Sequence, residues 1–463
     1  MNLFSLPTSL SLSLSLSLSL SSYLFLPLST SPLLSTCLLP QHFSLSDSLI
    51  SFPRTQLLHP HLILIPSNMT TRKCAAVVVG AGPAGVAVVG NLLERQLGTI
   101  AWIDPTFESG RVHRKYREVP SNTKVSLFQA YATSLQPFRT VIENTPRPNA
   151  FTTLAKLDQE KTCHLHYAAD MIRGLTNGLV KMDQVLACHG FVTAASLSGS
   201  REKEWIVRIK QNGPDGRDEE LQLQTSRLIL CTGSHPTNLP IPIPDLHITP
   251  LDLDTVLKPS VLSKTLPTTK QTTVAVVGAS HSAILALLNL VNLAQSSHPS
   301  LRVKWFTRHP LRYAEYMDGW ILRDNTGLKG LAADFAKTQL EDSVLSTSAA
   351  GKVIEKVDCS GGREKESEMY REHLPDCEYI TQAVGFTRDP LPKLLGEKGE
   401  SLSLEFDHET GAFHGDAGGE KIPGLFGAGI AFPQRVVDPY GNVEYAVGFF
   451  KFMKFLKKVV PTW

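Results

Sequence analysis

The chain has 463 residues, of which 42% are hydrophobic and 19% are charged, a composition typical of a globular protein with more than one domain. Its formal net charge of +2 is nearly neutral, so we expect no nucleic-acid partner. The seven cysteines include no C-x-x-C pair, which argues against a disulfide framework, and we expect no metal site.

Residues 1–68 differ in composition from the rest of the chain. They contain one acidic residue, Asp47, and one arginine, Arg54, and residues 9–20 alternate strictly between Ser and Leu. This pattern has no helical stripe and suits no packed domain. It leaves three alternatives: a mispredicted start with the true one at Met69, an organellar transit peptide, or a signal peptide or membrane anchor. We treat residues 1–68 as a leader that is disordered or not translated, and expect a cytoplasmic protein, or an organellar one if the leader is a transit peptide.

The first nucleotide-binding motif follows this leader. An apolar run over 74–79 predicts a buried parallel strand, and it leads into Gly80-Ala81-Gly82-Pro83-Ala84-Gly85, a complete G-x-G-x-x-G. The pattern then predicts a helix over 86–97 that ends at Gly98, and a second strand over 99–103 that ends in Asp104.

Each residue type in this motif has a physical role in holding a dinucleotide. Gly80 permits a tight turn, Gly82 lets the backbone approach a pyrophosphate, and Gly85 lets the helix pack closely on the strand. The helix start offers free N–H groups and a positive dipole end to the phosphates. Asp104 can accept hydrogen bonds from a ribose and disfavours a 2′-phosphate, so this site suits FAD or NAD.

The region after Asp104 is mixed. A helix is expected over 162–182, strands over 190–197 and 205–210, and a turn over 212–216. A basic stretch that precedes them is either a solvated loop or a group near the cofactor phosphates; it comprises Arg111, His113, Arg114, Lys115 and Arg117.

Two further strands end in glycine. A strand that begins at Arg227 ends in Thr232-Gly233, and one that begins at Tyr379 ends in Val384-Gly385. A glycine at a strand end lets the backbone lie close to a cofactor. Together the two motifs bracket residues 271–384 as an insertion in the first domain.

The bracketed segment repeats the organisation of the first motif. An apolar run over 273–277 leads into Gly278-Ala279-Ser280-His281-Ser282-Ala283, a helix is expected over 284–295, and a strand over 301–306 is followed by Thr307 and Arg308. Arg308 stands where the first motif has Asp104, and a guanidinium there can pair with a 2′-phosphate, so this site is expected to bind NADPH. His281, like His235, is a structural residue or one that reaches the flavin region.

The remaining signals lie after the second motif. Residues 313–330 follow the nicotinamide side, and we expect them to line the entrance to the active site. The segment 424–430 carries Gly429 at a third glycine motif. A closing helix is expected over 443–458, and its lysines at 451, 454, 457 and 458 are read as a solvated face.

On these motifs the chain resembles the two-dinucleotide-binding flavoprotein superfamily, which includes the pyridine nucleotide-disulfide oxidoreductases and the flavin-dependent monooxygenases. The resemblance covers residues 74–463. It implies an α/β fold with two nested Rossmann-like three-layer domains. The FAD-binding domain would span residues 69–270 and 385–463, with an NAD(P)H-binding domain over 271–384 inserted in it.

The resemblance favours the monooxygenase branch. The chain lacks the redox cysteine pair of the disulfide reductases, and Gly429 is followed by Ile430 instead of their acidic residue. The end of the second motif, Ser282-Ala283, is similar to the monooxygenase motif, although residues 237–270 lack the F-x-G-x3-H-x3-[FY] signature.

The resemblance implies FAD and NADPH as cofactors and a small organic molecule as substrate. A flavin monooxygenase is the main expectation, and an NADPH-dependent reductase that passes electrons to a quinone, or a flavin-bound redox sensor, remains the alternative. No catalytic residue beyond the flavin stands out, and nothing in the sequence fixes the oligomeric state.

Overall fold

A computed structural model describes residues 71–463 except 213–217, 242 and 416–417. The expectations for residues 1–68 lie outside the described residues, as does most of the turn expected over 212–216. Among the described residues, no helix combines the length and the apolar character needed to span a membrane.

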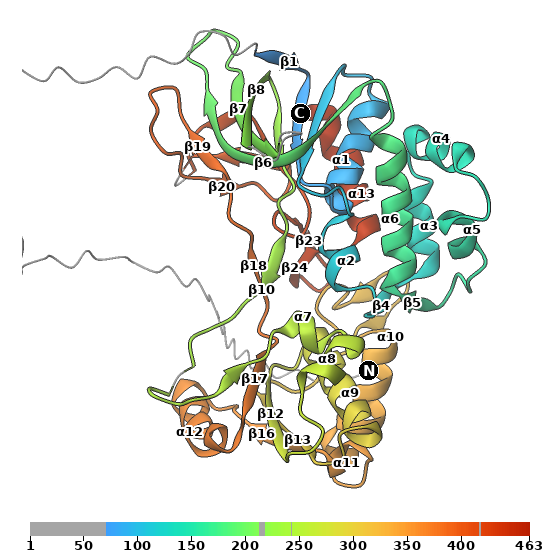
Figure 1. Cartoon of the computed structure of the whole chain (residues 1–463), viewed down its shortest axis with the longest axis vertical. Coiled ribbons are helices and arrows are strands. Elements are labelled where there is room, and N and C mark those ends of the chain that lie inside the picture. The colour runs from blue at the N-terminus through green and yellow to red at the C-terminus, as the bar shows by residue number, and fades with distance from the viewer. Residues whose placement is uncertain (1–70, 213–217, 242, 416–417) are drawn as a thin grey trace, which may run out of the picture. The chain divides into compact units, whose positions relative to one another are not determined.

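The larger sheet has eleven strands and is parallel at its centre (Figure 1). β6, β3, β2, β9 and β22 run parallel to one another, and β6 then continues into an antiparallel meander with β7 and β8. The strands of this sheet are β1 (Arg72–Cys74), β2 (Ala76–Val79), β3 (Ile100–Asp104), β6 (Val185–Leu197), β7 (Trp205–Asn212), β8 (Asp218–Thr225), β9 (Leu228–Leu230), β19 (Lys393–Leu395), β20 (Glu405–Phe406), β21 (Ala412–His414) and β22 (Lys421–Gly427).

Helices cover one face of the parallel strands. Fully buried Val78, Trp102 and Ile229 point into a core shared with these helices, and Val77 and Ala101 point into a second core under the antiparallel strands. The alternation follows from the period of two along a strand. The covering helices are α1 (Pro83–Glu94), α3 (Val125–Ala132), α4 (Gln136–Asn144), α5 (Ala150–Ala155), α6 (Leu165–Leu179) and α13 (Phe449–Val459), with the short α2 (Gly110–Lys115) beside α6.

The second sheet has five parallel strands in the order β11-β17-β12-β13-β16. They are β11 (Thr249–Pro250), β12 (Thr272–Val277), β13 (Leu301–Thr307), β16 (Ile354–Asp358) and β17 (Tyr379–Gln382). One face packs on α7 (Leu253–Val256), α8 (Pro259–Thr265), α9 (His281–Ser296) and α10 (Gly330–Phe335), with α11 (Asp342–Leu345) nearby, and the other on α12 (Arg363–His373). This sheet is therefore a second three-layer unit.

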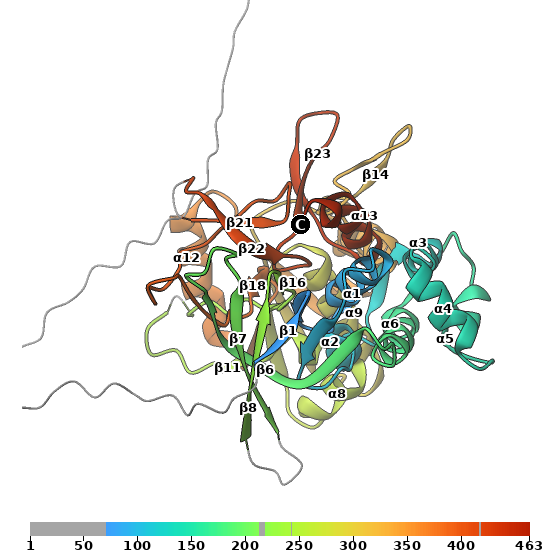
Figure 2. The same cartoon turned by 90° about the horizontal axis from the view of Figure 1, so that it is seen from above.

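Short two-stranded ribbons complete the fold. β10 (Ser234–Pro236) pairs with β18 (Phe386–Arg388) where the chain passes between the two sheets, and β4 (Pro120–Lys124) pairs with β5 (Thr162–His164). Two hairpins lie next to each other (Figure 2): β14 (Glu315–Tyr316) with β15 (Ile321–Leu322), and β23 (Gln434–Val437) with β24 (Val443–Ala446). Their contact includes the rings of Trp320 and Tyr440, whose centroids are 5.1 Å apart.

The predicted α/β class with two Rossmann-like units is confirmed. The boundaries of the inserted domain remain a prediction. Apolar side chains between Leu251 and Leu266 precede the expected boundary at 271 and pack with the second sheet, because α7 and α8 cover that sheet.

Several local expectations were wrong. The first helix begins at Pro83 and ends at Glu94 with Arg95 as its C-cap, so Gly98 is not the cap. The expected closing helix over 443–458 begins only at Phe449, because Val443–Ala446 pairs with β23 as a strand. The expected helix over 162–182 begins as strand β5, and the expected first strand divides at Ala75 into β1 and β2.

Candidate functional site

The first glycine motif forms a tight loop between β2 and α1. Gly80 has φ of +104°, and a methyl group on it would lie 2.4 Å from the carbonyl oxygen of Cys231. A methyl group on Gly85 would lie 1.9 Å from the carbonyl oxygen of Gly80, so only glycine allows the helix to approach the loop. Around Gly82, in contrast, nothing lies within 4 Å of the place of a side chain, which leaves the helix start open to a ligand.

Asp104 ties this loop to the end of β3. Its Oδ2 accepts the N–H of Ala81 at 2.7 Å, and its Oδ1 accepts the N–H groups of Thr106 at 2.9 Å and Phe107 at 2.8 Å. The carboxylate is 9% exposed. Because a carboxylate offers about four acceptor positions, one on Oδ2 remains for a ribose hydroxyl, so Asp104 fixes the loop as well as facing the predicted ribose site.

Three distant segments converge on this loop, at Gly110, Cys231 and Gly429. A methyl group on Gly110 would lie 3.0 Å from Cα of Gly82, and one on Gly429 would lie 2.6 Å from Cβ of Ala84. Two buried hydroxyls in these segments, those of Ser109 and Thr232, have no hydrogen-bond partner among the described residues. Orphaned buried hydroxyls beside an open helix start fit a polar ligand such as the diphosphate of FAD. Ser109 and Gly110 were not anticipated from the sequence, because only the fold brings this segment to Gly82.

The second motif repeats this geometry with different side chains. Gly278 has φ of +127°, and Trp305 donates its indole N–H to the Gly278 carbonyl at 2.7 Å, just as Trp102 donates to the Gly80 carbonyl at 3.0 Å. Ser280, at the position of Gly82, is exposed at the start of α9.

The strand end of the second motif differs from the prediction by one residue. The N–H of Gly80 bonds to the Ile103 carbonyl, and the N–H of Gly278 bonds to the Phe306 carbonyl. Thr307 therefore occupies the position of Asp104, and Arg308 follows it. The arginine is still placed to reach a phosphate, because it lies in the first turn beyond the strand.

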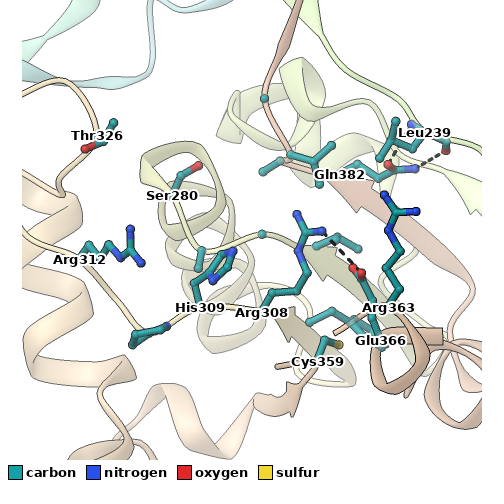
Figure 3. A pocket seen from close by; sticks show the side chains of 18 of the residues that line it. Leu239, Ser280, Arg308, His309, Arg312, Thr326, Cys359, Arg363, Glu366 and Gln382 are labelled. Atoms are coloured by element: carbon teal, nitrogen blue, oxygen red, sulfur yellow. Dashed lines mark hydrogen bonds and ion pairs between the residues drawn. The ribbon is translucent and has the colours of Figure 1, made fainter. Parts of the chain in front are cut away.

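Arg308 lies in a pocket of about 1120 Å³ together with the glycine loop of the second motif (Figure 3). Its guanidinium is 3.5 Å from Glu366 of α12, and Arg363, one turn earlier on the same helix, also lines the pocket. The Arg308 side chain is 55% exposed, so this ion pair is weak and can exchange for a phosphate. Gln382 and Leu239, joined by two hydrogen bonds, close the pocket near Gly385. Arg363 was not anticipated, because it comes 55 positions after Arg308 in the sequence.

A second cavity, of about 930 Å³, lies beside the start of α9. We call it cavity 2. His281 and Ser282 line it, whereas Ser280 lines the pocket of Arg308. The expected entrance segment contributes Tyr316, Trp320, Asp324 and Asn325 to the wall of cavity 2.

Charged residues join the two sides of cavity 2. Lys451 donates to Oδ2 of Asp324 at 2.8 Å and to Oδ1 of Asn325 at 2.6 Å, and Glu444 accepts the backbone N–H of Asn325 at 3.0 Å. Burial lowers the pKa of Lys451, although Asp324 opposes this shift. The reading of Lys451 as a solvated lysine was therefore wrong, while Lys454, Lys457 and Lys458 are exposed as expected.

The other candidates have structural partners. His235 contacts Oδ1 of Asp389 at 2.6 Å across the β10–β18 ribbon. Arg111 forms an ion pair with Asp254 of α7, so it is not a solvated loop residue. Cys74 and Cys231 are buried core residues, and burial raises the pKa of both thiols.

Comparison with known proteins identifies the family. No protein-family profile matches the chain. The monooxygenase AgnR1 of Paecilomyces divaricatus is 67% identical over 393 residues, which cover 85% of this chain and 98% of that protein. The solved ornithine N-hydroxylase of Kutzneria sp. 744, described with reduced FAD, NADP⁺ and L-ornithine, has a TM-score of 0.53 at 14% identity, covering 84% of this chain and 98% of that one.

The first relative establishes the activity class, and the second establishes the fold alone. Together they bear out the predicted fold and the monooxygenase class. The chain belongs to the same monooxygenase family as AgnR1.

Proposed function

We propose that the protein is an FAD-dependent, NADPH-using monooxygenase that acts on a small organic substrate. FAD lies with its diphosphate at Gly80–Gly85, and NADPH lies with its diphosphate at Gly278–Ala283. The observation that carries the proposal is the pair of open helix starts. Each follows a glycine with positive φ, and each is held by an indole N–H bonded to that glycine's carbonyl.

The residues around the first helix start are suited to FAD. The free N–H groups of α1 face the diphosphate, Asp104 has one acceptor position left for the ribose, and the hydroxyls of Ser109 and Thr232 gain the partners they lack. Cys231, which precedes Thr232, lies against Gly80, and Gly429 lies against Ala84. At the end of β3 the charge is the negative one of Asp104, which disfavours a 2′-phosphate.

The residues of the second pocket are suited to NADPH. Arg308 and Arg363 lie on two elements, the end of β13 and the start of α12, so their guanidinium groups can receive a 2′-phosphate from two directions. The predicted backbone approach at Gly385 lies in the same pocket.

When bound, FAD would accept hydride from NADPH and activate O₂, so that one oxygen atom enters the substrate and the other leaves as water. The chain supplies position and a screened cavity. The start of α9 separates the pocket of Arg308 from cavity 2, and the two hairpins with Trp320 and Tyr440 cover the boundary between them. Excluding water at this boundary limits side reactions with water.

Absorption spectroscopy of the purified full-length chain tests this proposal. The protein should show a flavin spectrum, bleach rapidly with NADPH and slowly with NADH in the absence of O₂, and form an oxygenated product when air and substrate are admitted. A protein that stays colourless after incubation with FAD would overturn the proposal. If NADPH bleaches the flavin, quinones reoxidise it and no oxygenated product forms, the reductase is favoured instead.

A further inference from the structure

Cavity 2 lies between the two cofactor motifs. On one side, the ring of Phe449 lies 5.3 Å from that of Phe128 and 5.8 Å from that of Tyr131, and the Tyr131 hydroxyl donates to the Pro83 carbonyl at 2.6 Å. On the other side, His281 begins α9. A molecule in cavity 2 would therefore touch walls that continue directly into both motifs.

The walls of cavity 2 are rich in aromatic rings. They come from the end of α2, from α3, β18 and α13, and from the β14–β15 hairpin: Tyr116, Phe128, Tyr316, Trp320, Phe386, Phe449 and Phe450. A cavity lined by several rings favours a flat apolar molecule, because such surfaces offer stacked and edge contacts with little loss of entropy.

One cation at this cavity has a donor to spare. Lys329, whose side chain is 10% exposed, bonds to the carbonyl of Asp324 at 2.6 Å and to its Oδ1. An ammonium has three N–H groups, so one of them has no acceptor within the described part of the chain. Lys451 differs, because its contacts with Asp324 Oδ2, the Asp324 carbonyl and Asn325 Oδ1 account for all three.

His281 lies in the same wall and is also unpartnered. Its Nδ1 is buried and has no hydrogen-bond partner among residues 71–463 as described, so no protein contact fixes the tautomer. Burial lowers the pKa of His281 to about 4, and the charge of Lys329 adds to this shift. At pH 7 the ring is neutral, and a neutral imidazole offers one acceptor nitrogen.

An acceptor and a donor in one wall complement a hydroxyl group. We propose that cavity 2 binds a flat aromatic substrate through a ring hydroxyl, which donates to the imidazole of His281 and accepts from the ammonium of Lys329. The inference rests on the proposed function, since it takes cavity 2 as the place of oxygenation. His281 and Lys329 are then residues that position the substrate.

Three probes of similar shape separate the two hydrogen bonds. 2-Naphthol can donate and accept, 2-methoxynaphthalene can only accept, and naphthalene can do neither. Dissociation constants are measured by titration calorimetry on the flavin-loaded full chain. We expect 2-naphthol to bind about 10-fold tighter than the ether, and the ether several-fold tighter than naphthalene.

Two substitutions test which residue accounts for each difference in affinity between the probes. His281→Phe keeps a ring and should reduce 2-naphthol to the affinity of the ether. Lys329→Met keeps the aliphatic stem and should reduce the ether to the affinity of naphthalene. Lys458→Met, on the exposed face of α13 and outside cavity 2, is the matched control and should change none of the three constants.

The outcomes distinguish this inference from the proposed function. Equal affinities for the three probes in the wild-type protein overturn the inference, even where a variant fails to fold. The same is true if the ranking persists in both folded variants. Anaerobic bleaching of the flavin by NADPH is recorded in the same samples, so a protein that bleaches but does not rank the probes loses only the inference, whereas one that does not bleach loses the proposed function.

Discussion

The two glycine motifs share one skeleton and differ in the side chains placed on it. In both, a tryptophan two residues before the strand-end position donates its indole N–H to the first glycine's carbonyl. The first motif then has Gly82, Pro83 and Asp104, where the second has Ser280, His281 and Thr307. The backbone of such a loop provides diphosphate binding in general, and these few substitutions decide which dinucleotide binds and what else the helix start contacts.

The largest effect is expected at the close contact between α1 and the first glycine loop. Gly85→Ala would place a methyl group 1.9 Å from the Gly80 carbonyl oxygen, against backbone that cannot yield. We expect destabilisation of about 3 kcal/mol and loss of bound flavin, because the loop must shift away from α1.

Ala283→Gly is the control in the second motif, where the native methyl group already fits. It should cost at most about 1 kcal/mol and leave the flavin in place. Thermal melts and flavin content measure both, and a yellow Gly85→Ala protein of normal stability would contradict the expectation.

Low pH should destabilise the second motif and not the first, because His281 stands where the first motif has Pro83, which has no titratable group. The pKa of His281 is lowered to about 4 in the folded protein from its ordinary value of 6.5. Between these values the unfolded chain takes up a proton that the folded chain does not. Stability is therefore present above pH 6.5 and is lost as the pH falls towards 4, by about 3 kcal/mol.

Denaturant melts of wild type and His281→Phe across this window measure the effect. His113 and His166, whose pKa values burial also lowers, are present in both proteins and cancel. The difference in free energy of unfolding should change steadily between pH 6.5 and 4. Parallel curves would show that His281 titrates normally.

Arg308 is expected to give the second motif its preference for NADPH over NADH. Arg308→Ala should lower kcat/KM for NADPH about 10- to 100-fold and leave NADH nearly unchanged, because only NADPH has the 2′-phosphate that the guanidinium pairs with. Lys365→Ala, an exposed lysine of α12 outside the pocket, serves as control. A loss shared equally by both nucleotides would place Arg308 elsewhere on the cofactor.

The smallest effects are expected at the shared tryptophans. Trp102→Phe and Trp305→Phe each remove one hydrogen bond to a glycine carbonyl, at about 1–2 kcal/mol of stability. The first should lower flavin retention and the second should raise the KM for NADPH. Melting temperature, flavin content and initial rates separate the two, and identical consequences would show that the motifs are not independent.

The sequence was sufficient for features that repeat locally. Both strand–loop–helix units and the Rossmann-like class follow from apolar runs and glycine spacing. It was insufficient wherever a partner lies far away in the chain. Val443–Ala446 has no strand signal of its own and becomes a strand because it pairs with β23. Lys451 is half-buried, and its ammonium pairs with Asp324, which comes from another hairpin.

The same limit applies to the candidate site. Gly80, Gly85 and Gly278 were assigned from spacing. Gly80 and Gly278 have positive φ, and Gly85 packs against the Gly80 carbonyl, while their binding of cofactors stays a prediction. Ser109, Gly110 and Arg363 escaped notice, since a serine, a glycine or an arginine outside a motif has no periodic signal. Only the packing of α2 on the first loop and of α12 near β13 brings them to the predicted cofactor sites.

The strand order of the larger sheet has a consequence for biosynthesis. Val77 pairs with Leu228, and Leu228 pairs with Leu425, so the larger sheet joins an early, a middle and a late part of the chain. The second sheet needs only residues between Thr249 and Gln382. During synthesis, the unit built on the second sheet can therefore fold before the larger sheet, whose early strands still lack β22. Chaperones would meet this protein with its oldest segment still incomplete.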